Sequence, residues 1–436
     1  MRVLLLSHTT GYQLRAFNDA AERLGIEIVF ATDRCHRLDD PWQDRAIAVR
    51  FHDVEASVAA IVEHASTAPI DGVIAVGDRP VVLAAAAAEA LRIPWHSVAG
   101  ARASADKRQS RAAIAAAGLP SPRFAVISAA DARAARLDSA SPVGTPYPCV
   151  LKPVGMSGSR GVIKADDPAA FAAAFDRIRA LLARPDVRSA RTGLEDEILV
   201  EQYIAGREFA LEGVLTRGTL DVFAIFDKPD PLEGPFFEET IYVTPSRLSS
   251  DAQARIADHV RRASEALGLR HGPIHAECRV TEEGMIYVLE VAARPIGGLC
   301  SRVFTFIDPE AASTGADAPV SLEEVLLLHA MGRPVTGYIR EAAAAAVMMI
   351  PIPTRGMYKG VAGEADARAV AGVTDVRITA KIGQVLETLP EAGSYLGFIF
   401  ARGATAADAE RSVRTAHATL AFSIAKDLLS TAGSRL

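Results

Sequence analysis

Apolar runs and amphipathic stretches alternate through the first hundred residues of the chain. Short apolar runs predict strands, and apolar residues at helical spacing predict helices between them. The predicted strands are Val3–Ser7, Ile26–Ala31, Ile47–Phe51 and Val73–Val76, and the predicted helices are Leu14–Leu24, Val54–His64 and Pro80–Leu91. This alternation predicts a doubly wound parallel sheet with helices on both faces. A further helix is expected over residues 101–120, where a Gly-Leu-Pro stop signal ends it.

The pattern becomes more varied after residue 121. Strands are expected at Arg123–Ile127 and Cys149–Pro153, a strand-rich segment over residues 198–244, and helices at Pro168–Ala183, Asp251–Leu267 and Leu322–Met331. Residues 341–436 are expected to form a separate compact unit. Its predicted elements are strands at Ala346–Pro351, Val373–Ile378 and Tyr395–Ala401 and a long final helix over Ala406–Leu429.

Two apolar runs, Ile274–Val280 and Met285–Val291, flank the polar residues 282–284 and predict a β-hairpin. With a two-residue turn, Glu277 lies directly or diagonally opposite Glu290. Side chains alternate between the faces of a strand, so in both registers the two carboxylates share one face. A three-residue loop would break this relationship.

This hairpin suits a metal ion and a negatively charged substrate. Two carboxylates on a rigid hairpin fit Mg²⁺, which takes few protein oxygens and completes its shell with water and phosphate. Arg294 comes four residues after Glu290 and shares its face while the strand stays extended. The arginine would then face the negative charge that develops there.

Composition narrows the class of protein. The 436 residues suggest about three domains, and the balance of 50% hydrophobic and 23% charged residues is ordinary for a globular protein. A net charge of -6 does not indicate the excess of basic residues that binding to nucleic acid or an anionic membrane requires. The four scattered cysteines form no CxxC pair, which fits free thiols in the cytoplasm. The N-terminus resembles a first strand rather than a signal peptide, and the apolar Val81–Ala88 run is too short to span a bilayer.

Two lysines lie in contexts that suit phosphate binding. Lys107 falls near the start of a predicted helix, and Lys152 lies inside an apolar strand, where a buried charge is costly unless it is paired. The glycine-rich segment Gly155–Gly161 follows directly, and such a loop can bring backbone N–H groups to phosphate oxygens. It matches neither a Walker A loop nor a Rossmann fingerprint. A flexible hairpin tip is the alternative, but the strand lysine favours phosphate binding.

Two further segments leave their roles open. Between Glu201 and Glu208 an apolar strand turns at Gly206, and its carboxylates are either solvated or lie beside an adenine and a ribose. In the segment DKPDPLEGPFFEETIYVTP, prolines and paired phenylalanines are interleaved with charged residues. That segment is either a polar loop before a strand or a wall of an organic-substrate pocket.

In this order and spacing, these segments together resemble the ATP-grasp carboxylate–amine ligases, in particular the L-amino acid ligase (dipeptide synthase) group. The resemblance runs from the HTTGYQ segment after the first strand to VMMIPIPTRGMYKGV and GSYLGFIFARG near the end of the chain. It implies an ATP-grasp fold of the α/β class with α+β parts. The implied domains are an N-terminal doubly wound domain (1–100), a linker helix with the small lid subdomain (101–205), a large subdomain with the metal site (206–338) and an α+β C-terminal domain (339–436).

The resemblance also implies roles for individual residues. ATP would be bound by Lys107, Lys152, Ser157, Gly158, Ser159, Gly161, Glu201, Gln202, Ile204 and Glu208, with the glycine loop closing over the phosphates and Glu208 holding the ribose. Mg²⁺ or Mn²⁺ would be held by Glu277 and Glu290. Substrate contacts would come from Glu239, Tyr242, Arg294, Gly297 and Gly298. Lys152 and Arg294 would serve catalysis, Arg294 by stabilising the acyl phosphate and the tetrahedral oxyanion.

One position departs from the usual E-x-N-x-R pattern of the family. Ala292 stands where the pattern has asparagine, so its side chain cannot give an oxygen to a metal. We expect a higher Mg²⁺ requirement and not a loss of activity, since two carboxylates and the substrate phosphates still supply ligands.

The implied activity is an ADP-forming ligase that joins a small-molecule carboxylate to an amine, with amino acids as the expected substrates. A biotin-carboxylase-like reaction is one alternative, although the chain has no Met-Lys-Met biotin-attachment segment. A non-catalytic nucleotide-binding protein is another, supported only by the missing asparagine. No nucleic-acid or membrane partner is expected. By analogy with other ATP-grasp proteins, a homodimer is a possible assembly.

Overall fold

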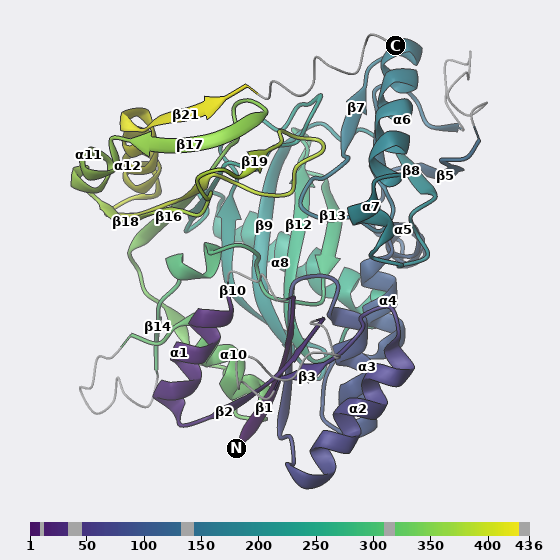
Figure 1. The fold of residues 1–436 in the computed structure, drawn as a ribbon, viewed down its shortest axis with the longest axis vertical. Helices are drawn as coiled ribbons and strands as arrows, with labels where there is room; N and C mark the ends of the chain where they lie inside the picture. The colour runs from purple at the N-terminus through teal and green to yellow at the C-terminus, as the bar shows by residue number, and fades with distance from the viewer. Residues whose placement is uncertain (9–12, 34–45, 132–143, 309–318, 427–436) are drawn as a thin grey trace.

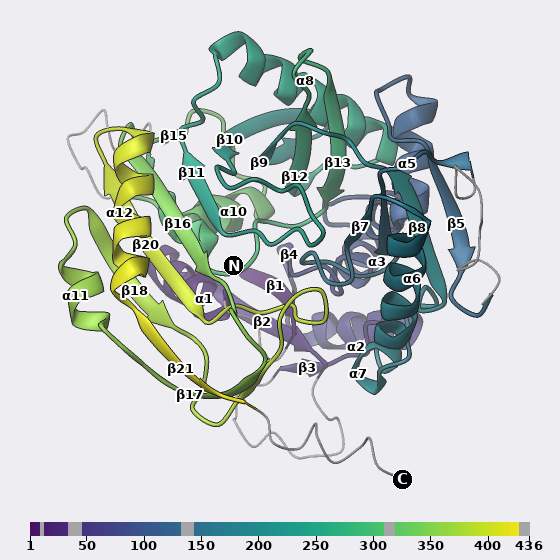
Figure 2. The ribbon, with the colours of Figure 1, turned by 90° about the horizontal axis from the view of Figure 1, so that it is seen from above.

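The computed structural model describes residues 1–8, 13–33, 46–131, 144–308 and 319–426. Its elements form a mixed α/β fold in which a parallel sheet, a small lid sheet and a long antiparallel sheet lie around one another (Figures 1 and 2). The expected fold class is confirmed.

The N-terminal residues form a four-stranded parallel sheet in the order β3-β2-β1-β4. Leu4 and Leu6 pack into a core with the helices after β3 and β4, whereas Val3 and Leu5 face the opposite core, because side chains alternate along β1. Figure 1 shows α2 and α3 on one side of this sheet and α1 and α10 on the other. The predicted doubly wound sheet is therefore present. Its elements are β1 (Arg2–Ser7), α1 (Leu14–Leu24), β2 (Glu27–Thr32), β3 (Ile47–Ala48), α2 (Val54–Thr67), β4 (Gly72–Val76), α3 (Val81–Leu91) and, from later in the chain, α10 (Leu322–Ala330).

The single helix expected over residues 101–120 is two helices, α4 (Val98–Ala105) and α5 (Lys107–Ala116). Asp106 between them is extended, and its carboxylate accepts hydrogen bonds from the backbone N–H groups of Arg108 and Gln109. This N-cap starts a new helix at Lys107. The prediction was wrong because the continuous alanine-rich pattern concealed a capping aspartate.

The lid is an antiparallel sheet in the order β5-β8-β6-β7, covered by two helices. Phe171, Phe175 and Ile178 recur at helical spacing on the first of these helices and fill the core beneath it. The lid elements are β5 (Phe124–Ser128), β6 (Cys149–Pro153), β7 (Ile163–Ala165), α6 (Pro168–Leu182), α7 (Pro185–Arg188) and β8 (Glu197–Gln202).

The long sheet has eight strands in the order β13-β12-β9-β10-β11-β16-β20-β18, with α8 (Ser250–Leu267) packed against it. Its strands are β9 (Arg207–Thr216), β10 (Thr219–Asp227), β11 (Ile241–Thr244), β12 (Gly272–Val280), β13 (Ile286–Ala292), β16 (Ala344–Ile350), β18 (Val373–Ile378) and β20 (Gly397–Gly403). Because β16 pairs with β11, the C-terminal strands extend the sheet that carries the hairpin. The C-terminal strands are therefore joined to the long sheet by backbone hydrogen bonds, and a separate C-terminal unit stays a prediction.

The remaining C-terminal elements include a three-stranded sheet in the order β19-β17-β21. The predicted final helix ends at Thr419, and residues 421–425 pair instead with β17. Phe422 and Ile424 alternate towards the core, a strand pattern that the helical periodicity before it concealed. The bounds are β17 (Gly356–Ala362), α11 (Glu364–Ala369), β19 (Val385–Leu386), α12 (Ala406–Thr419), β21 (Ala421–Ala425), a 3₁₀ turn at Cys300–Val303, and the short strands β14 (Phe306–Ile307) and β15 (Ile339–Arg340).

Candidate functional site

A cavity of about 750 Å³ lies where the N-terminal sheet, the lid, the long sheet and a C-terminal loop meet. Sixteen of the seventeen predicted site residues line it: Lys107, Lys152, Ser157, Gly158, Ser159, Glu201, Gln202, Ile204, Glu208, Glu239, Tyr242, Glu277, Glu290, Arg294, Gly297 and Gly298. Gly161 is not among the lining residues, and its N–H group donates to the Pro390 carbonyl. Of the HTTGYQ segment, His8 and Gln13 line the cavity, and residues 9–12 lie outside the described part of the chain.

The hairpin of β12 and β13 places Glu277 directly opposite Glu290. The Thr281 N–H donates to the Met285 carbonyl and the Met285 N–H donates to the Thr281 hydroxyl. These bonds close a three-residue loop, the length that was expected to break this pairing. A β-bulge corrects the register, because Cys278 pairs with Val288 and leaves one extra residue on β13. The two carboxylates therefore share a face for a reason that the turn alone did not predict.

Lys228, at the end of β10, was not predicted as a site residue. Its ammonium nitrogen lies 2.8 Å from a Glu208 oxygen, 2.5 Å from Glu239 and 2.9 Å from Glu277. Burial opposes the charge, but these three carboxylates raise the pKa of Lys228 well above its usual value. Its place in the sequence FAIFDK, directly after an apolar strand, was the available signal, whereas Lys152 was singled out by its place inside one.

The carboxylates around Lys228 fit a hard divalent cation by their chemistry. Oxygens of Glu208, Glu239 and Glu277 lie within 4.8 Å of one another, and carboxylate oxygens are the ligands that Mg²⁺ prefers. Glu290 lies on the same face of the hairpin but outside this cluster. Burial, and then the charge of Glu277, raises the pKa of Glu239 to about 7, while Lys228 and His275 hold the pKa of Glu277 well below its usual value against the effect of burial.

His275 is a second site residue that the sequence did not single out. It lies directly opposite Ala292, so an imidazole faces the position that lacks the family asparagine. Its Nδ1 is 3.1 Å from Glu212 and its Nε2 is 3.8 Å from Glu277. Burial disfavours the imidazolium, but the hydrogen bond to Glu212 and the nearby Glu277 carboxylate raise the pKa of His275 to about 9. His275 therefore adds positive charge beside Glu212 and Glu277 at neutral pH.

Arg294 is held by Asp78, which follows β4 in the N-terminal sheet. Its Nε donates to an Asp78 oxygen at 2.6 Å. Asp78 also accepts a hydrogen bond from Ser157 of the glycine loop, and its pKa is lowered by Arg294 in spite of burial. Lys107 donates to the Met156 carbonyl in the same loop. Asp78 was missed because 216 residues separate it from Arg294 in the sequence. The available signal was its position after the end of a parallel strand, where such sheets place functional groups.

Lys152 has the partner that its burial requires. Its ammonium group forms an ion pair with Glu201, which also pairs with Arg111 at 2.8 Å. Burial alone would raise the pKa of Glu201, but the two cations hold it at about 2. Arg111 is 1% exposed and lies four residues after Lys107 on α5. Its guanidinium also donates to the Leu289 carbonyl at 2.5 Å, so it fixes the bulge of the hairpin against the lid.

The lid end of the cavity is apolar and suits a flat aromatic ring. Val150, Tyr203, Leu232 and Phe237 form one small cluster there. Arg279 lies beside the Tyr203 and Phe237 rings, and its guanidinium also bonds to the Ile204 carbonyl at 2.8 Å and to Glu208 at 2.9 Å. The predicted adenine and ribose residues therefore lie side by side, held by an arginine that the sequence did not single out.

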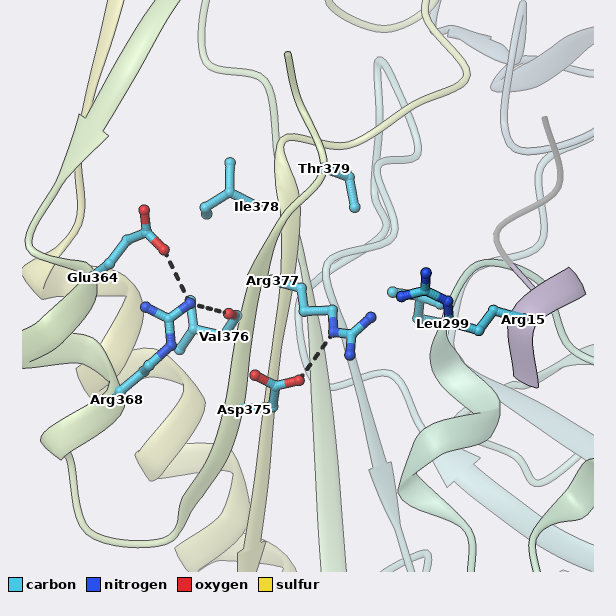
Figure 3. Close-up of a pocket in the computed structure, with 9 residues that line it drawn as sticks. All are labelled: Arg15, Leu299, Glu364, Arg368, Asp375, Val376, Arg377, Ile378 and Thr379. Atoms are coloured by element: carbon cyan, nitrogen blue, oxygen red, sulfur yellow. Dashed lines mark hydrogen bonds and ion pairs between the residues drawn. The ribbon is translucent and has the colours of Figure 1, made fainter. Parts of the chain in front are cut away.

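A second, shallower groove of about 590 Å³ lies between α1 and β18 (Figure 3). Its cations are largely neutralised within the groove, since Arg368 pairs with Glu364 at 3.0 Å and Arg377 with Asp375 at 3.1 Å. None of its residues lines the main cavity, so we place the chemistry in the main cavity. None of the helices in the described part of the chain combines the length and apolar character that crossing a bilayer requires.

Three domain families match the chain. An ATP-grasp N-terminal domain matches residues 18–95, an ATP-grasp domain matches residues 145–303, and L-amino acid ligase C-terminal domain 2 matches residues 348–425. The order of these matches is the one that the sequence resemblance implied.

Known proteins show the same likeness. Alanine–anticapsin ligase of Bacillus subtilis is 28% identical over 256 residues, which cover 56% of this chain and 52% of that protein. The chain thus spans about half the length of this curated relative. The crystal structure of L-amino acid ligase from Bacillus licheniformis has a TM-score of 0.80 at 25% identity, covering 98% of this chain and 99% of that one. Biotin carboxylase from Campylobacter jejuni has a TM-score of 0.63 at 17% identity, covering 98% and 92%, a likeness of fold alone.

Proposed function

We propose that this chain, which belongs to the ATP-grasp family and carries the C-terminal domain of L-amino acid ligases, uses ATP to join a carboxylate to an amine. One observation carries the proposal. A single cavity brings Lys107, Lys152 and Arg294, from three separate parts of the chain, to face a cluster of buried and half-buried carboxylates. Such a site balances the charges of a nucleotide triphosphate and a divalent cation.

The first step would transfer a phosphoryl group. A substrate carboxylate oxygen attacks the γ-phosphorus of ATP, the bond to the β-phosphate oxygen breaks, and ADP and an acyl phosphate result. Lys107 and Lys152 would bind the phosphates and offset the charge that moves onto the leaving oxygen. The apolar lid end would hold the adenine, with Glu208 at the ribose. Mg²⁺ or Mn²⁺, held by Glu277 and Glu290, would neutralise phosphate charge.

The second step would form the amide. The amine nitrogen attacks the acyl carbon, negative charge collects on the carbonyl oxygen, and the bond to phosphate breaks as the amine loses a proton. Arg294 would stabilise that oxyanion, and its bond to Asp78 fixes its direction before the substrate arrives. Glu239 and Tyr242, joined by a 3.0 Å hydrogen bond beside Gly297 and Gly298, would hold the amino group of a substrate.

We infer amino acids as the substrate class, because the protein named alanine–anticapsin ligase is a relative. The enzyme is expected to work in the cytoplasm, and a homodimer stays a prediction. The domain boundaries after residues 100, 205 and 338 also stay predictions.

The test is to incubate the purified protein with ATP, Mg²⁺ and pools of amino acids and other carboxylates. Phosphate release would be measured together with the masses of condensed products. We expect release that requires both a carboxylate and an amine, with a product lighter than their sum by one water. Phosphate release that depends on bicarbonate would instead indicate a carboxylase, and nucleotide binding without any turnover would indicate a non-catalytic protein.

A further inference from the structure

The loop between β19 and β20 touches both the lid and the substrate end of the cavity. Its residues 387–391 contact the glycine loop and the lid helices, and Gly393, Ser394 and Tyr395 line the cavity. Figure 2 shows this yellow-green segment reaching from β20 towards β7 and α6. We call residues 387–395 the latch loop.

Backbone contacts join the latch loop to the glycine loop. The Gly161 N–H donates to the Pro390 carbonyl at 2.8 Å, and the Arg160 guanidinium donates to the Glu391 carbonyl at 2.8 Å. On its other side Gly161 packs against Pro153 of β6, where a Cβ atom would lie only 2.5 Å from the proline ring. Only glycine allows the backbone to come this close to Pro153. The loop expected to cover phosphates is therefore held in place by the C-terminal domain.

Ion pairs extend the contact along the lid. Arg177 of α6 forms a bidentate pair with Glu391, at 2.6 and 2.8 Å, and its guanidinium lies 4.9 Å from the centre of the Phe236 ring. Arg184 pairs with Glu387 at 2.8 Å. A single exposed ion pair contributes little, but a bidentate pair within a network is held in one geometry and contributes more. These contacts exist only while the lid lies against the latch loop.

The other end of the latch loop reaches the substrate. Tyr395 packs against Phe398, with ring centres 6.1 Å apart, and its phenol lies near Glu239 and Cys300. Burial, and then the negative charge of Glu239, raises the pKa of Tyr395 well above its usual value. A substrate held at Glu239 would therefore touch the same short loop that holds the lid.

We propose that the latch loop couples lid closure over the nucleotide to substrate binding, with Tyr395 as the positioning residue that senses the substrate. This inference rests on the proposed function. A substrate that orders Tyr395 would order Glu387 and Glu391, and these would hold the lid closed. Nucleotide and substrate would then strengthen each other's binding, since coupling between two sites is reciprocal.

The test measures the affinity of the full-length protein for the Mg²⁺ complex of the non-hydrolysable analogue AMP-PNP, with and without amino-acid pools. We expect the pools to tighten AMP-PNP binding by about fivefold or more. The double substitution Glu387→Gln and Glu391→Gln should abolish that increase. Arg188→Gln is the matched control, because Arg188 forms a bidentate pair with Asp196 inside the lid without reaching the latch loop.

Tyr395 is tested by its own pair of variants. Tyr395→Ala should remove the increase and raise the KM of the amino acid more than it lowers kcat, whereas Tyr395→Phe should keep both close to wild type. An increase that survives in the latch variant, or that Arg188→Gln abolishes equally, would overturn the coupling. Amide formation by the same protein preparations, assayed separately with ATP in place of AMP-PNP, separates the two hypotheses. Amide formed without any increase in AMP-PNP affinity refutes the latch alone, whereas no amide in any pool refutes the ligase and the latch that rests on it.

Discussion

Glu277 and Glu290 lie directly opposite each other only because the extra residue Leu289 interrupts the ladder between β12 and β13. The three-residue hairpin loop sets one register near the tip, and the bulge shifts it before the two carboxylates. Arg111 donates to the carbonyl of the bulged residue, so the register of Glu277 and Glu290 is tied to the helix that begins at Lys107.

Glu277→Gln and Glu290→Gln should each lower kcat by on the order of 100-fold, because each removes a charge expected to hold Mg²⁺. Each should also remove the rise in Tm that Mg²⁺ gives to the wild-type protein. Glu283→Gln, in the exposed tip of the same hairpin, is the control and should change neither quantity. An unchanged Mg²⁺ shift in both site variants would refute the metal assignment.

Arg294→Lys should lower kcat by about 100-fold, because lysine cannot reproduce the guanidinium contacts of an oxyanion site. Asp78→Asn should lower kcat by roughly tenfold, since Arg294 would lose its partner but keep its charge. The combined variant should cost less than the product of the two effects, because both changes act on one interaction. Steady-state kinetics of the three variants would check this, and fully multiplicative effects would show that Asp78 acts independently.

Amino-acid binding should improve as the pH rises through about 7, because the pKa of Glu239 is raised to about 7 and only its ionised form attracts an ammonium group. The same raised pKa means that Glu239 stabilises the ligand-free fold below the ordinary carboxyl pKa and loses that contribution as the pH rises through 7. The profile of kcat/KM for the amino acid should therefore lose this step in Glu239→Gln. A step that persists in the variant would assign the titration to another group.

Stability should fall as the pH drops from 6.5 towards 4, because burial lowers the pKa values of His96 and His329 to about 4. Both imidazoles are neutral in the folded protein. Their contribution to the free energy of unfolding is therefore complete above the unfolded pKa of 6.5 and is lost as the pH falls through 4. The loss has an upper bound of about 3 kcal/mol per histidine. His329 stacks on His271 at 4.5 Å, which places a further imidazole beside the charge that protonation would create.

Urea unfolding at several pH values would measure this slope. His96→Gln and His329→Gln should each flatten it, whatever their effect on stability at pH 7, whereas the exposed His52→Gln should leave it unchanged. A slope that neither buried variant alters would place the acid sensitivity elsewhere in the chain.

The local pattern of apolar and polar residues predicted most of the helices and strands. Alternating apolar runs predicted the doubly wound sheet, and the hairpin was found from two apolar runs and a polar tip, because local hydrogen bonding and burial act over a few residues. The same patterns failed at Asp106 and at residues 421–425. In the first case a capping carboxylate decided the outcome, and in the second a partner strand about sixty residues earlier in the chain did so.

The sequence by itself determined which residue types could bind phosphate and metal. A lysine in an apolar strand shows a buried charge that needs a partner, and paired glutamates on one hairpin supply oxygen ligands, and both features are visible within a few residues of sequence. Only the tertiary structure decided what neutralises them. Asp78 for Arg294, Glu201 and Arg111 around Lys152, and Lys228 among three carboxylates are pairings between distant segments. Electrostatic interaction depends on distance in space and on burial, and neither can be read from separation along the chain.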